Sequence, residues 1–240
     1  MEKVNVFSRM FWLFLALGLT TAVFYSCEKD DDGGNGSIGE NASKITATNV
    51  INGSTQLTTI KACAYWYSGD IESGDFESGE DVIAQAPYKN NGFTLELPAT
   101  LSAKYLIPIM AAGTQELVDT IVSDKNANVY DLGVLYGFDK EENEIGFLHL
   151  EGTNNGGDEY YYTDWMYADR DVTVKGEVKD IYYRDDYGMI EKYDWELKKG
   201  WNVVYSSHID SYDDSTGRKV EIHTYTSQKP SGISYLWKYN

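Results

Sequence analysis

Histidines are the side chains of this chain best suited to metal binding or proton transfer near neutral pH. The chain has three, His149, His208 and His223, and no pair has the H-E-x-x-H spacing of a helical zinc site. If the strands that carry His208 and His223 form a hairpin, the two imidazoles become neighbours and could bind a metal together with Asp210. Two histidines on adjacent strands are more often incidental neighbours, so we assign no metal here.

Carboxylates follow His208 in a short polar loop. Asp210, Asp213 and Asp214 offer oxygen ligands of the kind that Ca²⁺ prefers. The loop lacks the regular alternation of ligands and the terminal Glu of an EF-hand. We therefore predict a solvated turn, with calcium bound by these three aspartates as the weaker alternative.

Motifs of the common enzyme classes are missing from the sequence. It contains no G-x-S-x-G, no P-loop and no dinucleotide fingerprint. Cys63 lies in a strand-like run without a nearby histidine, so we expect a buried side chain and no nucleophile. We expect no enzymatic activity and no cofactor. A hydrolase remains the least favoured alternative, since it needs two carboxylates facing each other about 5–10 Å apart, and 38 acidic residues make any such pair unspecific.

Aromatic residues are the unusual feature of the second half of the chain, in a protein with 20 Tyr and 6 Trp. Neighbouring residues on a strand point to opposite faces, so the run 160–162 cannot be buried on one side only. Exposed aromatic rings among carboxylates suit the apolar faces and hydroxyl groups of sugars. We name as candidate ligand-binding residues Tyr161, Trp165, Tyr167, Trp195 and Trp201. The alternative is that these residues only fill the core of a β-structure.

The charge of the chain bears on its partners. Lys plus Arg number 20 against 38 Asp plus Glu, a formal net charge of −18. A surface this acidic repels a polyanion, so we exclude nucleic acid as a partner.

Alternation of apolar and polar residues indicates that these side chains are positioned by β-strands. Residues 172–178 and 220–225 alternate in this way, and no window shows sustained helical spacing. We predict an all-β fold that ends in an eight-stranded antiparallel meander, closed as a barrel or flattened as a sandwich. The predicted strands are 128–138, 144–151, 159–167, 171–180, 187–197, 201–208, 218–226 and 233–239.

The first half of the chain forms a separate expectation. A polar stretch at 123–126 predicts a boundary between an antiparallel β-sandwich domain at 44–122 and the aromatic-rich β-domain at 127–240. Residues 92–98, with the pattern Gly-x-hydrophobic-x-Leu-x-Leu-Pro, resemble a strand of transthyretin-like or carboxypeptidase-regulatory-like sandwich domains. An Ig-like sandwich would fit the same pattern.

The N-terminus is typical of an exported protein. A basic start precedes an apolar run at 10–24, which is too short to span a bilayer and predicts a signal peptide at 1–26. The residues up to Cys27 resemble a bacterial lipobox, which implies lipid attachment at Cys27. The acidic and Gly-rich tether at 27–43 resembles the surface-export signal of Bacteroidetes lipoproteins. This resemblance implies a lipid-anchored protein on the outer membrane that faces the cell exterior.

Three further segments, 167–174, 197–205 and 229–232, resemble uncharacterised surface lipoproteins of gut Bacteroidetes, a group that implies location and fold but no activity. Thr120 and Ser215 lie in triplets that resemble the O-glycosylation signal of exported Bacteroidetes proteins. We expect a non-enzymatic surface module that binds a glycan or another extracellular ligand. The alternative is a structural or adhesive subunit that assembles with partner proteins by strand addition.

Overall fold

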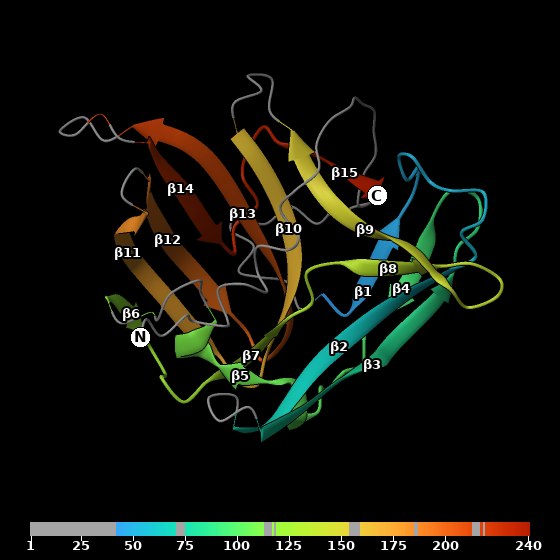
Figure 1. Ribbon diagram of the computed structural model, residues 1–240, viewed down its shortest axis with the longest axis horizontal. Coiled ribbons are helices and arrows are strands. Elements are labelled where there is room, and N and C mark those ends of the chain that lie inside the picture. The colour runs from blue at the N-terminus through green and yellow to red at the C-terminus, as the bar shows by residue number, and fades with distance from the viewer. Residues whose placement is uncertain are drawn as a thin grey trace, which may run out of the picture.

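The computed structural model describes residues 42–70, 75–112, 117, 119–153, 159–184, 187–212, 217 and 219–240 (Figure 1). Regular structure in these ranges is β-strand, apart from two single-turn 3-10 helices at Ala103–Tyr105 and Ile109–Ala111. The all-β fold class is therefore confirmed. None of the described residues belongs to a helix that is long and apolar enough to cross a bilayer. The expected signal peptide at 1–26, Cys27 and the tether up to residue 41 lie outside the described residues.

The strands of the described part are β1 (Lys44–Ala47), β2 (Thr59–Asp70), β3 (Asp75–Pro87), β4 (Phe93–Glu96), β5 (Ile107–Pro108), β6 (Thr120–Val122), β7 (Asn128–Asp131), β8 (Leu135–Phe138), β9 (Glu144–Thr153), β10 (Glu159–Ala168), β11 (Val172–Arg184), β12 (Tyr187–Leu197), β13 (Gly200–Tyr212), β14 (Lys219–Thr226) and β15 (Ser234–Tyr239).

Most predicted strands of the second half coincide with observed strands because an alternation of period two is a local property of the chain. In β11, Val172 and Val174 are buried, whereas Lys175 is exposed. One predicted strand, 128–138, is two strands, β7 and β8. Gly133 between them has a φ of 60°, in the left-handed region where a strand cannot continue.

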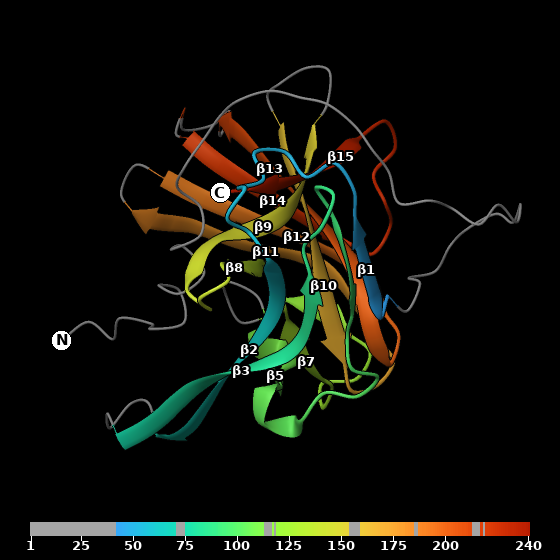
Figure 2. The same cartoon turned by 90° about the vertical axis from the view of Figure 1, so that its right-hand side faces the viewer.

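One thirteen-stranded sheet contains all strands except β1 and β4. Its main path runs β3-β2-β8-β9-β10-β13-β14-β12-β11-β6, with β5, β7 and β15 attached to its sides. The path begins at β3 and ends at β6 without closing, so the sheet is not a barrel. The strands β9, β10, β13, β14, β12 and β11, in this order across the sheet, form its curved part. The β2–β3 hairpin projects from the body in Figure 2.

The strand order corrects the prediction of a sequential antiparallel meander. β10 pairs with β13 rather than with β11, and β14 pairs in parallel with β12 and antiparallel with β13. Strands β12 and β13 are joined by only two residues, yet β14 lies between them farther from this turn. There it pairs with residues 187–194 of β12 and residues 205–212 of β13. The alternation pattern is the same for every such strand, so it does not specify which neighbour a strand takes.

The ladders also cross the expected boundary at 123–126. Pairing of β2 with β8, β5 with β7 and β6 with β11 joins the segment 44–122 to the following half in one sheet. The small antiparallel sheet of β1 and β4 packs on one face of the large sheet. A single core cluster there includes Ile45 and Leu95 together with Trp165, Trp201 and Trp237. The sandwich of this protein therefore forms between the two halves of the chain.

The opposite face of the curved part carries the second core cluster. It contains Val129, Met166, Val174, Trp195 and Val204, all buried. These side chains occupy one end of the face, near the η-turn at Ile109 and strands β5 and β7. Toward the other end, the same face carries histidine, carboxylate and tyrosine side chains. We call this end the polar face, and it is built from β9, β10, β12, β13, β14 and β15.

Candidate functional site

Two histidines lie side by side on the polar face. β13 and β14 pair antiparallel with His208 directly opposite His223, which confirms that the two are cross-strand neighbours. Their rings stack with centroids 4.7 Å apart and an interplanar angle of 13°. Such a register pair brings side chains as close as a sheet allows.

Glu221 completes a cluster with these histidines because residues i and i+2 of a strand share a face. One side-chain ligand atom from each of His208, Glu221 and His223 lies within 4.8 Å of the others. The His208 Nε2 atom is 3.7 Å from Glu221 Oε1, and His223 Nε2 is 3.5 Å from Glu221 Oε2. The three side chains are only 12–15% exposed.

Burial determines the protonation of the cluster. It lowers the pKa of His223 to about 4, with a further lowering by the neighbouring His208. Burial also lowers the pKa of His208, against the opposing effect of Asp210. Both imidazoles are therefore neutral at pH 7, and each has a ring nitrogen with a free lone pair. Burial raises the pKa of Glu221 from its ordinary value.

Two charged residues border the cluster on its exposed side. Asp210 lies opposite Glu221 in the β13–β14 ladder, and its Oδ1 atom is 3.5 Å from His208 Nε2. Lys219 Nζ lies 3.0 Å from Asp210 Oδ2 and 3.8 Å from Glu221 Oε1. The lysine thus compensates part of the negative charge at this end of the face.

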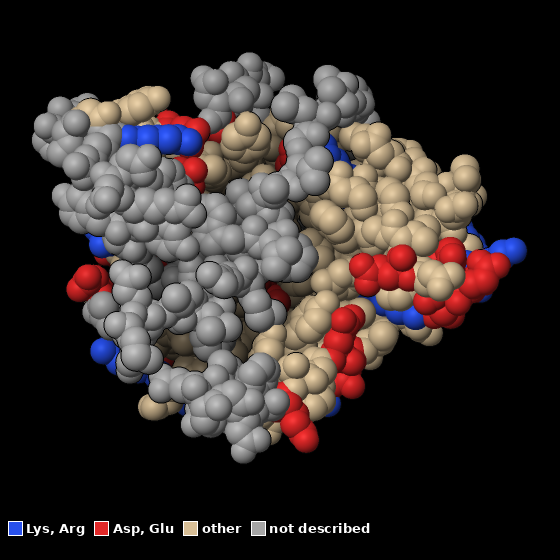
Figure 3. Space-filling model, in the orientation of Figure 1, with Lys and Arg blue, Asp and Glu red and all other residues tan. Residues whose placement is uncertain are grey.

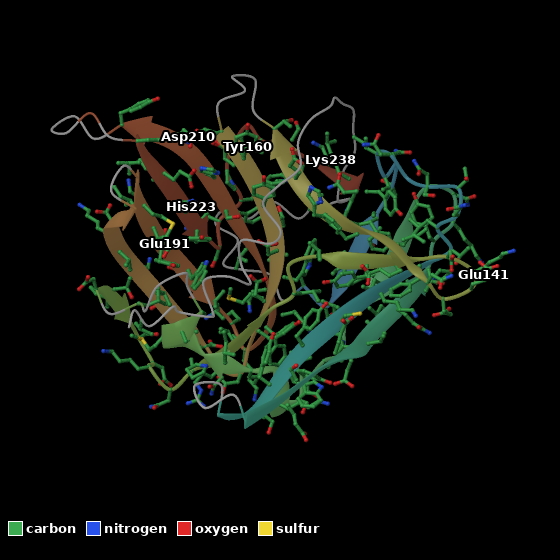
Figure 4. All side chains as sticks on the ribbon, in the orientation of Figure 1. Glu141, Tyr160, Glu191, Asp210, His223 and Lys238 are labelled. Atoms are coloured by element: carbon green, nitrogen blue, oxygen red, sulfur yellow. The ribbon has the colours of Figure 1, made fainter. Side chains whose placement is uncertain are left out.

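β14 is inserted between β12 and β13 like a wedge, and this position also places the cluster beside β12 and close to β10. Glu191 of β12 pairs in register with His223 and is 1% exposed. Its carboxylate accepts a hydrogen bond of 3.0 Å from the Tyr193 hydroxyl. Tyr160 of β10 lies opposite His208, with ring centroids 6.0 Å apart. Figure 4 shows Tyr160, Asp210, His223 and Glu191 on this part of the sheet.

A second titratable group on the polar face is already saturated. Lys238 Nζ lies 2.7 Å and His149 Nε2 3.3 Å from the Glu151 carboxylate. Burial alone would raise the pKa of Glu151, but these two partners outweigh it and lower that pKa. Glu151 is thus already paired with Lys238 and His149. Among the described residues, no second histidine joins this group, whereas His208 lies beside His223, Glu221 and Asp210.

Two aspartates lie deeper, between the polar face and the second core cluster. Burial raises the pKa of Asp131 to about 6. The pKa of Asp164 is raised well above its ordinary value, first by burial and then by repulsion from Asp131. Like charges in low dielectric cannot both ionise readily, so this pair retains protons in a pH range where exposed aspartates are ionised.

Four of the five predicted ligand-binding aromatics are core residues, which corrects that interpretation. Trp165, Tyr167, Trp195 and Trp201 are at most 6% exposed. The Trp201 indole donates a hydrogen bond of 2.9 Å to the Pro98 carbonyl, and its ring contacts Tyr167 edge to face. Tyr161 is half-buried and donates a hydrogen bond to Glu159. The strands β1 and β4 and the second core cluster cover both faces of the sheet at this level, so large aromatics are buried on both.

Among the side chains that the structure describes on the polar face, Tyr160 and Tyr212 are the exposed aromatics, at 52% and 69% exposure, and neither was among the residues predicted from the sequence. Tyr160 belongs to the noted run 160–162, but its exposure depends on the register with β13. Tyr212 lies four residues beyond His208, so both point to the same side of β13. This spacing places Tyr212 roughly 13 Å along the strand from His208.

The remaining predicted residues have varied positions. Asp210 is exposed and paired with Lys219, whereas Asp213, Asp214 and Ser215 lie outside the described residues. Thr120 is 8% exposed, and its hydroxyl donates a hydrogen bond of 2.7 Å to the Leu117 carbonyl, so the folded chain shields it from glycosylation. Cys63 is buried as expected, and burial raises the pKa of its thiol to about 12, which makes it unreactive.

The surface carries the acidic character of the sequence. Figure 3 shows Asp and Glu side chains gathered where the turn at 139–143 joins β8 to β9. Glu141 and Glu142 of this turn have side chains 59% and 64% exposed.

Comparison of the chain with protein-family models, curated proteins and solved structures finds no match.

Proposed function

We propose that this protein is a non-enzymatic, lipid-anchored module of the outer cell surface that binds a glycan on its polar face. The observation that carries the proposal is the exposure of Tyr160 and Tyr212 on the same face as Asp210 and the two histidines.

The chemistry of these side chains suits a sugar. The apolar C–H face of a pyranose packs on a phenol ring, and carboxylates accept strong hydrogen bonds from hydroxyl groups. Tyr160, opposite His208 on the neighbouring strand β10, and Tyr212 on β13 supply two rings that are offset by roughly 13 Å along the strand direction. Asp210 lies between them with a side chain that is 55% exposed. The site therefore fits an oligosaccharide better than a single sugar.

Net charge narrows the class of glycan. The chain has a formal net charge of −18, which repels sialylated or sulfated ligands. We infer that the ligand is a neutral oligosaccharide.

The anchor is part of the proposal and rests on the sequence around Cys27. Acyl chains contribute about 0.8 kcal/mol of membrane affinity per buried CH₂, so an acidic protein needs no basic patch to remain attached. Incorporation of radiolabelled palmitate that is lost in Cys27→Ala, together with cleavage by protease on intact cells, supports this location. Absence of label or resistance to external protease rejects it.

Binding is tested on an array of neutral and acidic oligosaccharides. We expect binding to neutral members, and we expect Tyr160→Ala and Tyr212→Ala each to weaken it about tenfold, the loss of one stacking contact. Tyr67→Ala is the matched control, since Tyr67 is 37% exposed on β2, away from the polar face. The proposal is rejected if the native chain binds no oligosaccharide, or if the Tyr160→Ala and Tyr212→Ala variants bind as tightly as the native chain.

The alternative of a structural subunit that assembles by strand addition needs an accessible sheet edge. The terminal strand β3 is such an edge, but it carries exposed Glu77 and Glu80 together with Asp81. Like charges on two copies of this edge oppose each other, and charged edges are a known protection against edge-to-edge pairing. The charges on β3 therefore disfavour self-association through this edge, whereas strand addition by a partner protein of opposite charge stays the alternative function.

A further inference from the structure

The cluster of His208, Glu221 and His223 has a property that hydrogen bonding does not explain. The His208 Nε2 atom is buried, and it has no hydrogen-bond partner among the described residues. Its nearest acceptors, oxygens of Asp210 and Glu221, are 3.5 and 3.7 Å away, too far for a good hydrogen bond. Buried polar atoms in folded proteins almost always have a partner, and an ion is one of the common explanations when none is present.

The three side chains are held together by the sheet. His208 and His223 occupy one cross-strand pair, and Glu221 occupies the next position on the same face of β14. Ligands on paired strands stay in place because the ladder hydrogen bonds fix their separation. Since the three ligand atoms lie within 4.8 Å of one another, all of them can reach one cation.

We propose that His208, Glu221 and His223 bind a zinc ion. Two imidazole nitrogens and one carboxylate oxygen form a donor set that Zn²⁺ accepts, whereas Ca²⁺ and Mg²⁺ prefer oxygen ligands alone. Three protein ligands leave the fourth position of a tetrahedral ion to water or to Asp210, whose Oδ1 atom is 3.5 Å from His208 Nε2. The proposal does not rest on the glycan-binding function, because none of the three ligands is one of the sugar-contacting side chains Tyr160, Tyr212 and Asp210; only the fourth position, if Asp210 takes it, is shared.

Zinc binding requires the three ligand atoms to move closer together. Zinc bonds of 2.0–2.2 Å place the ligand atoms of a tetrahedral site about 3.3 Å apart. Glu221 Oε1 lies 3.7 Å from His208 Nε2, and Glu221 Oε2 lies 3.5 Å from His223 Nε2, so the carboxylate must turn to present one oxygen to both nitrogens. The two rings are nearly parallel, with centroids 4.7 Å apart, so both must rotate about their side-chain bonds before their nitrogen lone pairs converge on one ion.

Neighbouring charges favour a divalent cation. Glu221 and Asp210 together supply two negative charges beside the imidazoles, and Glu191 lies next to His223 on β12. Lys219 is the one positive side chain that faces this group among the described residues, and it is closer to Asp210, at 3.0 Å, than to Glu221, at 3.8 Å. A zinc ion at Glu221 therefore leaves the shorter ion pair of Lys219 intact.

The site is tested by titrating the full chain, without an affinity tag, with zinc chloride in a calorimeter. We expect one zinc ion per chain, a rise in the unfolding temperature on addition of zinc, and the visible absorption of a tetrahedral site when Co²⁺ replaces Zn²⁺. His208→Gln and His223→Gln should each weaken zinc binding by at least about 100-fold, because loss of a ligand costs more than loss of its supporting contacts.

His149→Gln is the matched control, since His149 is the third histidine of the chain and lies on the same face in an ion-paired network. Its zinc affinity should equal that of the native chain. Glu221→Gln retains the shape of the side chain and should also weaken binding, which gives a second variant if a histidine substitution impairs folding. The proposal is overturned if the native chain shows no saturable zinc binding, or if the His223→Gln and Glu221→Gln variants bind zinc as tightly as the native chain. Zinc alone is the probe, so failure of the glycan array does not affect this result.

Discussion

The three histidines on one face of this protein have different neighbours. His208 and His223 are neutral since burial opposes their protonation, whereas His149 lies beside an ionised Glu151 that Lys238 also contacts. A neutral imidazole can act as a metal ligand through its unprotonated ring nitrogen. The chemistry of each histidine is therefore decided by two or three contacts.

Asp131→Asn should change how stability depends on pH. An aspartate whose pKa is raised from 3.8 to about 6 by burial stabilises the fold below the lower value and loses that contribution as pH rises through the higher one. An asparagine does not ionise and can still accept the hydrogen bond of 3.1 Å from the Gly133 N–H. From pH 4 to pH 7, the stability of the variant should therefore rise relative to the native chain by up to about 3 kcal/mol. Urea unfolding at several pH values measures this difference.

Asp139→Asn is the control with the opposite sign. Hydrogen bonds from Asn143 and Glu141 lower the pKa of Asp139, so its ionised form stabilises the turn above the ordinary pKa and this contribution is lost on acidification. This variant should be less stable than the native chain at pH 7, and the difference should shrink below about pH 4. A pH-independent effect of Asp131→Asn would contradict the assignment of a buried, protonated carboxyl.

At the scale of elements, the wedge of β14 between β12 and β13 is the feature that builds the candidate site. The two strands diverge after a two-residue turn, and Asn202 satisfies that turn from inside the sheet. Its Oδ1 accepts a hydrogen bond of 2.8 Å from the Lys198 N–H, and its Nδ2 donates to the carbonyls of Lys198 and Gly200 at 2.7 and 2.9 Å. Ser227 closes the end of the wedge by donating its N–H to the Asp194 carbonyl and accepting from the Glu196 N–H.

Asn202→Ala should destabilise the protein strongly for the size of the change. The side chain is 0% exposed, and its removal leaves three backbone groups of the turn without their partner. We expect a loss of about 2–4 kcal/mol, because each buried polar group left without a hydrogen bond costs about 1–3 kcal/mol. Denaturant unfolding measures the loss. Asn143→Ala, in the exposed turn between β8 and β9, is the control and should cost less than about 1 kcal/mol.

At the scale of the whole molecule, the first and last parts of the chain share one core. Trp237 of β15 stacks on Trp165 of β10 at 5.6 Å and contacts Phe93 of β4 edge to face at 5.3 Å. Its indole also donates a hydrogen bond of 3.3 Å to the Thr46 carbonyl in β1. Three segments far apart in sequence therefore depend on a single side chain.

The segment 127–240 should not fold on its own. Without β1 to β4, the face that carries Trp165, Trp201 and Trp237 would be exposed to water. We expect this fragment to lack a cooperative unfolding transition, and we expect the full chain to unfold in one transition. Trp237→Ala in the full chain should cost about 3–5 kcal/mol and lower that transition as a unit. Two separate transitions, or an independently folded fragment, would show that the halves are autonomous.

Most strands of the second half could be predicted from the sequence, because alternation of apolar and polar residues is a local property. The predicted range 187–197 is β12, and the predicted 218–226 differs from β14 by one residue. The sequence also indicated that His208 and His223 could meet, since both lie on strands that a short loop connects. It could not select Glu221 as their third partner, because that role depends on the register of the ladder.

The neighbours of each strand and the exposure of each aromatic ring depend on contacts between distant segments, which no local pattern contains. Backbone hydrogen bonds are alike in every ladder, so the insertion of β14 next to β12 depends on the fit of the whole sheet and on the Asn202 turn. Exposure of a ring depends on what covers it, and this is why Trp201 is buried below β1 and β4 whereas Tyr160 is exposed. Local pattern thus specifies each strand and its two faces, and packing between distant segments specifies which of those faces is covered and which stays exposed.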